Sequence, residues 1–450
     1  METYDVIVIG GSVSGAPTAM LLARQGHKVL LIDKHAFPRD ANSTHFIWPR
    51  GMSYLNRWGI AEPILQATPF FRKMEVCIEG ISLHGSVPLA DLQQRFRRLH
   101  GDDRGAIDCY CGPRRYFLDH HLLNCAREAG VTVRERVTYQ APIYQDGRLV
   151  GITACDEDDH EFQVRAQLVI GADGRFSNFV KDVGARDTDF RPLSTFAYFG
   201  YFRGIDKPEL AIHKRGRFGT AIFPTLDNTH MVLVYGPTAS WDDFRRNPEQ
   251  HFLDIYRFCA PDVAALIERA ERTEPFKAAA RMEAFQRESV GPGWALVGDA
   301  GSFKDQVTAM GITHAFRDAE LISGYIHRAL AGEFPMDEGL RQYRLARAGD
   351  YVDYFDFVCK TAEMNNYSVN DLKYFYSIQN NQPAIDQMLS QFGDTLPLKA
   401  GKAPALLPES AYPDDLLHFD PTRYPGKFPL CRERAGLDDM LLPVEELAAL

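Results

Sequence analysis

The chain has 450 residues, of which 45% are hydrophobic and 24% charged, an ordinary globular composition that can build a large core. The formal net charge of −10 argues against nucleic acid as a partner, because no basic stripe is available to neutralise phosphates. The sequence shows no secretory signal and no apolar stretch long enough to span a bilayer, so we expect no integral membrane association.

Cysteine and histidine usage bears on compartment and on metals. The eight cysteines are scattered without a C-x-x-C pair, which indicates reduced thiols and a cytoplasmic location. His120 and His121 are adjacent on an expected helix, where neighbouring side chains point apart, and no H-E-x-x-H motif occurs. We therefore expect no metal site. A G-x-S-x-G elbow, which would indicate a hydrolase, is also absent.

The first residues follow the pattern of a strand, a glycine-rich loop, a helix and a second strand. The apolar runs 5–9 and 29–32 are typical of parallel strands buried on both faces. Between them stands GGSVSG at 10–15, in which Gly10 turns the chain tightly and Gly15 lets the helix pack closely. Asp33 ends the second strand, where a carboxylate can bind a ribose hydroxyl. The pattern predicts a dinucleotide at the helix N-terminus.

Ser12 takes the place of the second glycine of G-x-G-x-x-G. Because the backbone passes beside a pyrophosphate there, a small residue whose side chain points outward can replace glycine. The Ser12 hydroxyl could also donate to a phosphate oxygen. The alternative, a βαβ unit that binds no nucleotide, is disfavoured by the combination of strands, glycines, helix and terminal acid.

Further motifs follow in order along the chain. A buried strand runs into GADG at 171–174, another into GDA at 298–300, and a helix opens at Gly311-Ile312, with R-x-x-x-D at 115–119. In order and spacing these motifs resemble the FAD-dependent monooxygenases of the para-hydroxybenzoate hydroxylase type. That superfamily also contains flavin halogenases and geranylgeranyl reductases. The resemblance covers about three quarters of the chain, and the motifs are jointly very specific.

The resemblance implies FAD as the cofactor and assigns residues to it. It places the pyrophosphate in the first loop, at Gly10, Ser12, Val13, Ser14 and Gly15. Further cofactor contacts are implied for Asp33, Lys34, Arg39, Arg115, Val137, Asp173, Asp299, Met310, Gly311 and Ile312.

The implied contacts divide by the part of FAD that they touch. Asp33 would hold the adenosine ribose, Val137 would lie against adenine, and Arg115 and Asp299 would contact the ribityl and phosphate portion. Asp173 would lie between FAD and the incoming nicotinamide. Arg39 stays ambiguous between a flavin contact and a surface charge, as does Arg50.

The implied contacts at the isoalloxazine come from the helix opened by Gly311. Its N-terminus would point at the flavin N1, where reduced flavin carries negative charge that a helix N-terminus stabilises. The relatives carry Asp-Pro or Pro-Pro before this glycine, whereas this chain has Gln306, which restores an N–H and frees φ. Met310 would bring a flexible apolar side chain to the flavin edge.

The substrate region is predicted more coarsely. The segments 194–202, 219–224 and 230–235 are rich in β-branched and aromatic residues and predict an antiparallel sheet. Most of these rings are expected to be ordinary core, but a cavity built there favours an apolar or aromatic ligand. His45 falls where relatives pass the chain beside the isoalloxazine, so it is the catalytic candidate for proton transfer. The alternative is a histidine that caps a loop.

The sequence thus predicts an α/β fold, with a Rossmann-like FAD-binding domain interleaved with an antiparallel-sheet substrate domain and followed by a helical C-terminal region. The expected FAD-binding segments are 1–75, 106–180 and 281–330, and the expected substrate-domain segments are 76–105 and 181–280. C-terminal helices are expected over 331–392 and an extended Pro-rich arm over 393–450. No second nucleotide-binding unit is found, so NADPH or NADH would dock only transiently.

The expected activity is an NAD(P)H-dependent FAD monooxygenase. It would insert one oxygen atom from O2 into an apolar or aromatic small molecule through a C4a-hydroperoxyflavin, whose chemistry belongs to the cofactor. The alternatives are a reductase of isoprenoid double bonds and a flavin halogenase, although the W-x-W-x-I-P signature of tryptophan-type halogenases is absent. A flavin-binding protein without catalytic turnover is a further alternative. We expect a monomer or a homodimer.

Overall fold

The computed structural model describes residues 1–450 except 351, 400, 402–403, 425–427, 429 and 431–450. The chain divides into two compact units, each built from three segments. The first contains Met1–Ile64, Pro113–Pro192 and Glu283–Phe357, and the second contains Leu65–Gly112, Leu193–Met282 and Val358–Leu450. The expected substrate segments 76–105 and 181–280 fall largely in the second unit, whereas residues 331–357 join the first. The functional names of the predicted domains stay a prediction.

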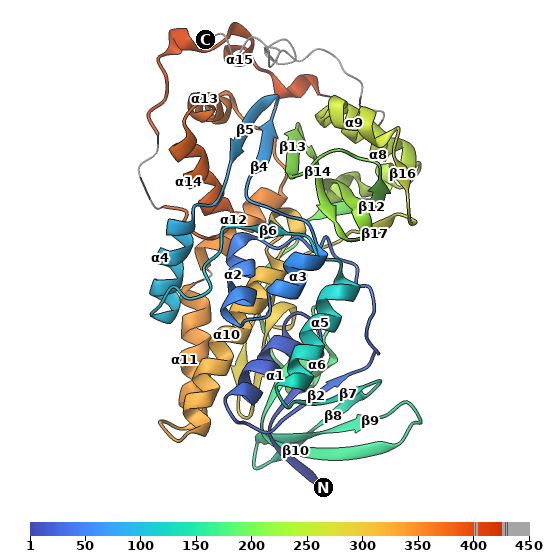
Figure 1. Ribbon diagram of the computed structural model, residues 1–450, viewed down its shortest axis with the longest axis vertical. Coiled ribbons are helices and arrows are strands. Elements are labelled where there is room, and N and C mark those ends of the chain that lie inside the picture. The colour runs from blue at the N-terminus through green and yellow to red at the C-terminus, as the bar shows by residue number, and fades with distance from the viewer. Residues whose placement is uncertain (351, 400, 402–403, 425–427, 429, 431–450) are drawn as a thin grey trace. The chain divides into compact units, whose positions relative to one another are not determined.

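The first unit is built on a parallel sheet with the strand order β20-β10-β1-β2-β7. The strands are β1 (Glu2–Ile9), β2 (Val29–Asp33), β7 (Thr132–Glu135), β10 (Glu161–Gly171) and β20 (Trp294–Leu296). The antiparallel β19 (Val290–Gly291) pairs with β20. Helix α1 (Gly15–Arg24) packs between α5 (Arg115–Glu128) and α10 (Gly311–Leu330), as Figure 1 shows. The predicted Rossmann-like architecture is confirmed.

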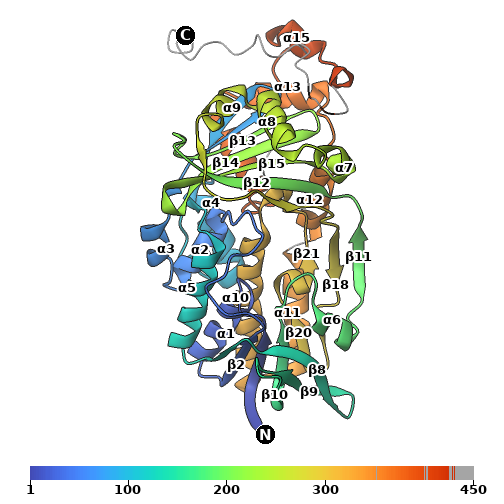
Figure 2. The same cartoon turned by 90° about the vertical axis from the view of Figure 1, so that its right-hand side faces the viewer.

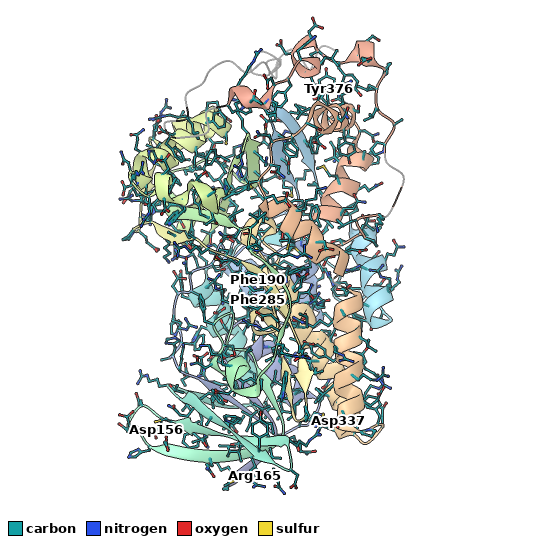
Figure 3. All side chains as sticks on the ribbon, turned by 180° about the vertical axis from the view of Figure 1, so that it is seen from behind. Asp156, Arg165, Phe190, Phe285, Asp337 and Tyr376 are labelled. Atoms are coloured by element: carbon teal, nitrogen blue, oxygen red, sulfur yellow. The ribbon has the colours of Figure 1, made fainter. Side chains whose placement is uncertain are left out.

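The rest of the first unit surrounds this sheet. The hairpin β8 (Thr138–Gln145) and β9 (Arg148–Cys155) pairs with β10, and its side chains form a core with those of the parallel strands and α6 (Asn178–Val183). A three-stranded sheet contains β11 (Asp187–Arg191), β18 (Ala284–Arg287) and β21 (Ser302–Phe303), with Phe190 opposite Phe285 (Figure 3). Helices α2 (Pro49–Arg57) and α11 (Met336–Gly349) also belong to this unit.

The second unit contains the predicted antiparallel sheet, which is confirmed in β12 (Thr195–Arg203), β14 (Phe218–Thr225) and β15 (Thr229–Pro237). The strand order is β16-β12-β15-β14-β13-β4-β5, with β17 also paired to β12. The remaining strands are β4 (Met74–Ile78), β5 (Ile81–Gly85), β13 (Leu210–Arg215), β16 (Glu271–Arg272) and β17 (Lys277–Ala279). The short β3 (Phe70–Phe71) and β6 (Tyr110–Cys111) pair with each other.

Helices of the second unit cover its sheet and continue to the C-terminal segment. The face that carries Phe196, Phe218 and Val234 packs against α7 (Trp241–Phe244), α8 (Pro248–Cys259) and α9 (Pro261–Ile267), visible in Figure 2. The other helices are α4 (Leu89–His100), α13 (Val369–Ile378), α14 (Gln382–Phe392) and α15 (Asp414–Leu417). The chain passes between the units within α3 (Glu62–Ala67) and α12 (Val352–Ala362). Among the described helices, none combines the length and apolar character needed to cross a membrane.

Candidate functional site

The carboxyl ends of three parallel strands bring the predicted motifs together at one edge of the sheet. GGSVSG follows β1, GADG follows β10, and GDA follows β20. Gly10 has a φ of +106°, and a Cβ placed on it would lie 2.5 Å from the Ala172 carbonyl oxygen. A Cβ on Gly15 would lie 1.8 Å from the Gly10 carbonyl oxygen. Both positions therefore require glycine, because a side chain would collide with backbone.

The N-terminus of α1 presents unused donors. The backbone amides of Val13, Ser14 and Gly15 have no hydrogen-bond acceptor among the described residues, whereas the Ala16 amide donates to the Ser12 carbonyl at 3.0 Å. Amides at a helix N-terminus carry partial positive charge and bind anions. The loop can thus hold the pyrophosphate of a dinucleotide.

Asp33 organises the adjoining strand end. Its Oδ2 accepts from the Gly11 amide at 2.7 Å and its Oδ1 from the His35 amide at 2.8 Å. Each carboxylate oxygen keeps a second acceptor site, which suits a ribose hydroxyl. The Val137 amide donates to the Asp33 carbonyl at 2.9 Å, so these two predicted residues lie together. Lys34 is exposed.

Arg39 lies six residues beyond the end of β2. Its side chain is half-buried, and its Nε has no acceptor among the described residues. The guanidinium carbon lies 5.5 Å from the centre of the Phe37 ring. A flavin contact for Arg39 stays a prediction.

Ser12 and Arg115 meet through a carboxylate that the sequence did not single out as a ligand. Arg115 donates from Nε to Asp119 Oδ1 and from Nη2 to Asp119 Oδ2, each at 2.8 Å. Arg115 Nη2 also donates to Ser12 Oγ at 2.7 Å, and the Ser12 hydroxyl donates to Asp119 Oδ2. The Ser12 hydroxyl is therefore engaged by two protein groups, and its donation to a phosphate oxygen stays a prediction.

The GDA turn packs against the first loop. Gly298 has a φ of +57°, and a Cβ placed on it would lie 2.8 Å from the Ser14 Cβ. Burial raises the pKa of the neighbouring Asp299, against the lowering effect of the Lys304 and Arg115 cations. Whether protonated or ionised, the Asp299 carboxyl can form a hydrogen bond with a ribityl hydroxyl.

Asp173 follows the end of β10, and its Oδ1 is buried with no hydrogen-bond partner in the described structure. Burial raises the pKa of the Asp173 carboxyl above its usual range. A buried carboxylate oxygen without a partner costs free energy, so it suits a donor supplied from outside the chain.

The N-terminus of α10 is the second helix end with unused donors. The amides of Gly311, Ile312 and Thr313 have no acceptor among the described residues, and the first intrahelical bond runs from His314 to the Met310 carbonyl at 3.0 Å. Gly311 is exposed and a Cβ placed on it would meet no atom within 4 Å, whereas Met310 is buried. This helix end is open to a bound anionic or electron-rich group.

The loop before α10 contacts the segment that carries His45. The Trp48 Nε1 donates to the Thr308 carbonyl at 3.0 Å. Asp305 caps the short helical turn Gln306–Thr308, because its side chain accepts from the Val307 amide. His45 is 1% exposed with a φ of 44°, a left-handed conformation that histidine adopts more readily than most residues. The catalytic role of His45 stays a prediction.

A buried ionic cluster that no sequence motif predicted contacts the GDA turn. Asp318 accepts from the Gly298 amide at 3.0 Å, from Arg317 Nη2 at 2.6 Å and from Arg347 Nε at 3.0 Å. Arg50 pairs with Asp350 at 2.6 Å and is fully buried, so its interpretation as a surface charge is wrong. Charges on helices usually indicate solvated faces, and nothing local in the sequence distinguishes these.

Lys304 is a further buried cation that sequence analysis did not propose as a site residue. Its side chain lies between β21 and the turn before α10 and is 8% exposed as a residue. Burial lowers the pKa of Lys304 to about 7. The signal in the sequence was only that Lys304-Asp305-Gln306 departs from the pattern of the relatives.

Within the described residues, ligand atoms of Asp156, Asp158 and His160 lie within 4.8 Å of one another on the exposed turn after β9. Asp156 Oδ1 accepts from the amides of the other two residues at 3.0 and 2.9 Å. This carboxylate therefore has a structural role in the turn, and we assign no metal to it.

Comparison with known proteins places this geometry in a family. A family model described as FAD binding domain matches residues 3–349. Conditioned medium factor receptor 1 of Dictyostelium discoideum is 23% identical over 76% of this chain and 66% of its own length. The 1H-pyrrole-2-carbonyl-[peptidyl-carrier protein] brominase of Pseudoalteromonas luteoviolacea is 23% identical over 74% of this chain and 79% of its own length. The solved structure of the flavin-dependent brominase Bmp2 superimposes with a TM-score of 0.73 at 19% identity, covering 87% of this chain and 94% of Bmp2.

Other relatives of similar identity come from different reaction classes. A kynurenine 3-monooxygenase of Christiangramia forsetii is 24% identical over 56% of each chain. A digeranylgeranylglycerophospholipid reductase of Thermoplasma acidophilum is 25% identical over 70% of this chain and 76% of its own length. The glycine cradle, the two open helix ends, the Asp33 carboxylate and the Arg115 guanidinium all fit FAD, so the predicted cofactor is confirmed.

Proposed function

The chain belongs to the FAD-binding domain family and is an FAD-dependent oxidoreductase, and from this premise we propose that it is an NAD(P)H-dependent monooxygenase acting on an apolar or aromatic small molecule. The relatives include monooxygenases, halogenases and a reductase at 22–25% identity, so identity alone does not distinguish these reactions.

One observation supports the nature of the substrate. The sheet of the second unit has a second face, opposite to the one covered by α8 and α9, and this face is also apolar and aromatic. Along β12 and β15 it carries Phe199 opposite Leu233 and Tyr201 opposite Met231. These side chains are buried or half-buried. An apolar face of this kind favours a substrate that is itself apolar or aromatic.

Tyr235 supplies a polar group on the same face. Its ring lies over Gly219, where a Cβ would come within 2.3 Å of it. Among the described residues the Tyr235 hydroxyl has no hydrogen-bond partner, and burial raises its pKa above the ordinary tyrosine value. A neutral phenol in an apolar surface can orient a substrate hydroxyl or carbonyl by one hydrogen bond.

In the proposed reaction, NAD(P)H, a proton, O2 and the substrate give the hydroxylated product, water and NAD(P)+. FAD supplies the oxygen activation once it is reduced. The chain's own contribution is to bind the cofactor, to exclude water and to stabilise charge. The amides at the N-terminus of α10 would stabilise negative charge on the bound cofactor.

Product analysis tests this proposal. FAD-loaded protein is incubated with NADPH or NADH and a panel of phenols, anilines and indoles under ¹⁸O2. Substrate-stimulated NAD(P)H oxidation with one ¹⁸O atom in the product is expected. Halogenated products that appear only with bromide or chloride would replace the proposal by a halogenase. Reduction of a polyprenyl substrate under anaerobic conditions would replace it by a reductase.

A His45→Asn variant tests the catalytic candidate. Asparagine tolerates the left-handed backbone of position 45 but cannot transfer a proton near neutral pH. If His45 transfers a proton during turnover, product formation falls by about 100-fold while FAD binding is unchanged. Equal turnover by the variant and the wild type would assign His45 to the loop alone.

We also propose a cytoplasmic location. All seven described cysteines are buried, and those at 77, 109, 111, 125, 155 and 259 form no disulfide. Unpaired thiols in this number are typical of a reducing compartment. Fractionation with compartment markers tests the location.

A further inference from the structure

Ser12, which replaces the second glycine of G-x-G-x-x-G, makes side-chain hydrogen bonds that a glycine could not make. Ser12 lies in the loop before α1, whereas Arg115 and Asp119 lie one turn apart on α5. The hydroxyl of Ser12 accepts from Arg115 Nη2 at 2.7 Å and donates to Asp119 Oδ2. The Ser12 hydroxyl thus links the glycine-rich loop to α5 by hydrogen bonds.

The donors of Arg115 can be accounted for one by one. A guanidinium has five N–H groups in a rigid fork. Nε donates to Asp119 Oδ1, and Nη2 donates to Asp119 Oδ2 and to Ser12 Oγ. The two N–H groups of Nη1 have no partner among the described residues. The Arg115 side chain is 11% exposed and the Asp119 side chain is fully buried.

We propose that Ser12 is a positioning residue that holds the Arg115 guanidinium, so that the Nη1 edge faces FAD. Asp119 fixes one edge of the fork, and the Ser12 hydroxyl fixes the remaining hydrogen of Nη2. Only the Nη1 edge is then left for the cofactor, and its orientation is set before FAD arrives. Preorganised donors bind more tightly because less conformational freedom is lost on binding.

The proposal rests on FAD binding and not on the monooxygenase reaction. It also reverses an expectation from the sequence. If serine at position 12 is only compatible with FAD binding and does not contribute to it, Ser12→Gly leaves FAD affinity unchanged. If the hydroxyl positions Arg115, Ser12→Gly and Ser12→Ala both weaken binding, because one Nη2 hydrogen loses its acceptor.

FAD titration of the full-length apoprotein, followed by flavin fluorescence, separates these outcomes. We expect Kd to rise about tenfold in Ser12→Gly and Ser12→Ala, the effect of losing one hydrogen bond to a charged group. Ser12→Thr keeps the hydroxyl and is expected to retain an affinity within about threefold of wild type. Thermal unfolding of each apoprotein shows whether a variant is folded before its Kd is interpreted.

A double-mutant cycle distinguishes positioning of Arg115 from a general effect on the loop. Lysine at 115 keeps the charge but lacks the fork. In an Arg115→Lys background, Ser12→Ala is therefore expected to change the Kd by less than about twofold. The proposal is overturned if Ser12→Gly binds FAD as tightly as the wild type. It is also overturned if Ser12→Ala costs the same affinity in both backgrounds. Neither result depends on whether the protein hydroxylates, halogenates or reduces its substrate.

Discussion

At the scale of single residues, Lys304 shows how the fold sets the charge of a buried group. Burial lowers its pKa to about 7. The Arg317 and Arg347 guanidiniums also lower the pKa, whereas the Asp299 and Asp318 carboxylates raise it. An unfolded lysine titrates near 10.4. Between about pH 7 and pH 10 the unfolded chain therefore binds a proton at this position that the folded chain does not. The free energy of unfolding rises with pH in that window.

A Lys304→Met variant tests this linkage in the apoprotein. Methionine has similar bulk and no charge, so the variant is expected to be more stable than wild type at pH 6.5. The difference should shrink toward pH 9.5, where the folded wild type carries a neutral lysine. Thermal melts at three pH values measure it.

The exposed Lys181 provides the matched control, since Lys181→Met removes a solvated charge. That variant is expected to show no trend in Tm difference over the same pH range. A constant Tm difference for Lys304→Met would show that the lysine stays protonated in the fold throughout.

At the scale of elements, the candidate FAD site depends on helix N-termini whose backbone amides have no acceptor among the described residues. Helix α10 begins at Gly311, which is exposed, and three amides there have no acceptor among the described residues. The same helix contains Gly324, where a Cβ also meets no atom within 4 Å. Both glycines have space for a methyl group, but only Gly311 lies at the helix end for which the family resemblance implies a flavin contact.

Gly311→Ala is accordingly expected to leave the apoprotein folded, with a Tm equal to or slightly above that of wild type, since alanine forms helix more readily than glycine. FAD affinity is expected to fall by about tenfold or more, because the new methyl group occupies the approach to the helix amides. Gly324→Ala should give the same or greater gain in Tm with no change in Kd. Equal Kd values for both variants would contradict a flavin contact at Gly311.

The elements also show what the sequence could predict. Each motif follows directly after a parallel strand, so local pattern and order sufficed to bring the loops at Gly10, Gly171 and Gly298 to one edge of the sheet. The bond from Ser12 to Asp119 could not be predicted in this way. The two residues are 107 positions apart, and the position of the Asp119 side chain depends on how α5 packs. The buried Arg317 and Asp318 were missed for the same reason, since burial of a charge is decided by tertiary packing.

At the scale of the whole molecule, each unit is assembled from three separated segments. The second unit is completed by the C-terminal part of the chain, which sequence analysis predicted only as an extended arm. Tyr424 donates to Glu79 Oε2 at 2.6 Å, and the Gly216 amide donates to Oε1 at 2.8 Å. Phe428 stacks on His251 with 4.3 Å between ring centres. Residues 431–450 of the predicted arm lie outside the described residues.

Glu79 makes this anchor sensitive to pH. Its side chain is fully buried, and burial raises its pKa above the ordinary glutamate value, against the lowering effect of the Tyr424 hydrogen bond. A carboxyl whose folded pKa is raised destabilises the fold at pH values above that pKa. This cost is relieved as the pH falls through the folded pKa, where the buried group becomes neutral.

A Tyr424→Phe variant keeps the ring but withdraws the donor from Glu79. The apoprotein is expected to lose about 1–3 kcal/mol of stability at pH 8, the cost of leaving a buried carboxylate short of one hydrogen bond. Because the variant raises the pKa of Glu79 further, the loss should be smaller at pH 5. Melts at both pH values measure the loss. Tyr412→Phe is the control, since among the described residues the Tyr412 hydroxyl bonds only to the neutral Ser377 hydroxyl. FAD affinity should not change, because the predicted cofactor residues all lie in the first unit. A pH-independent loss would contradict the role given to the Glu79 carboxyl, and a parallel loss of FAD affinity would contradict the confinement of this anchor to the second unit.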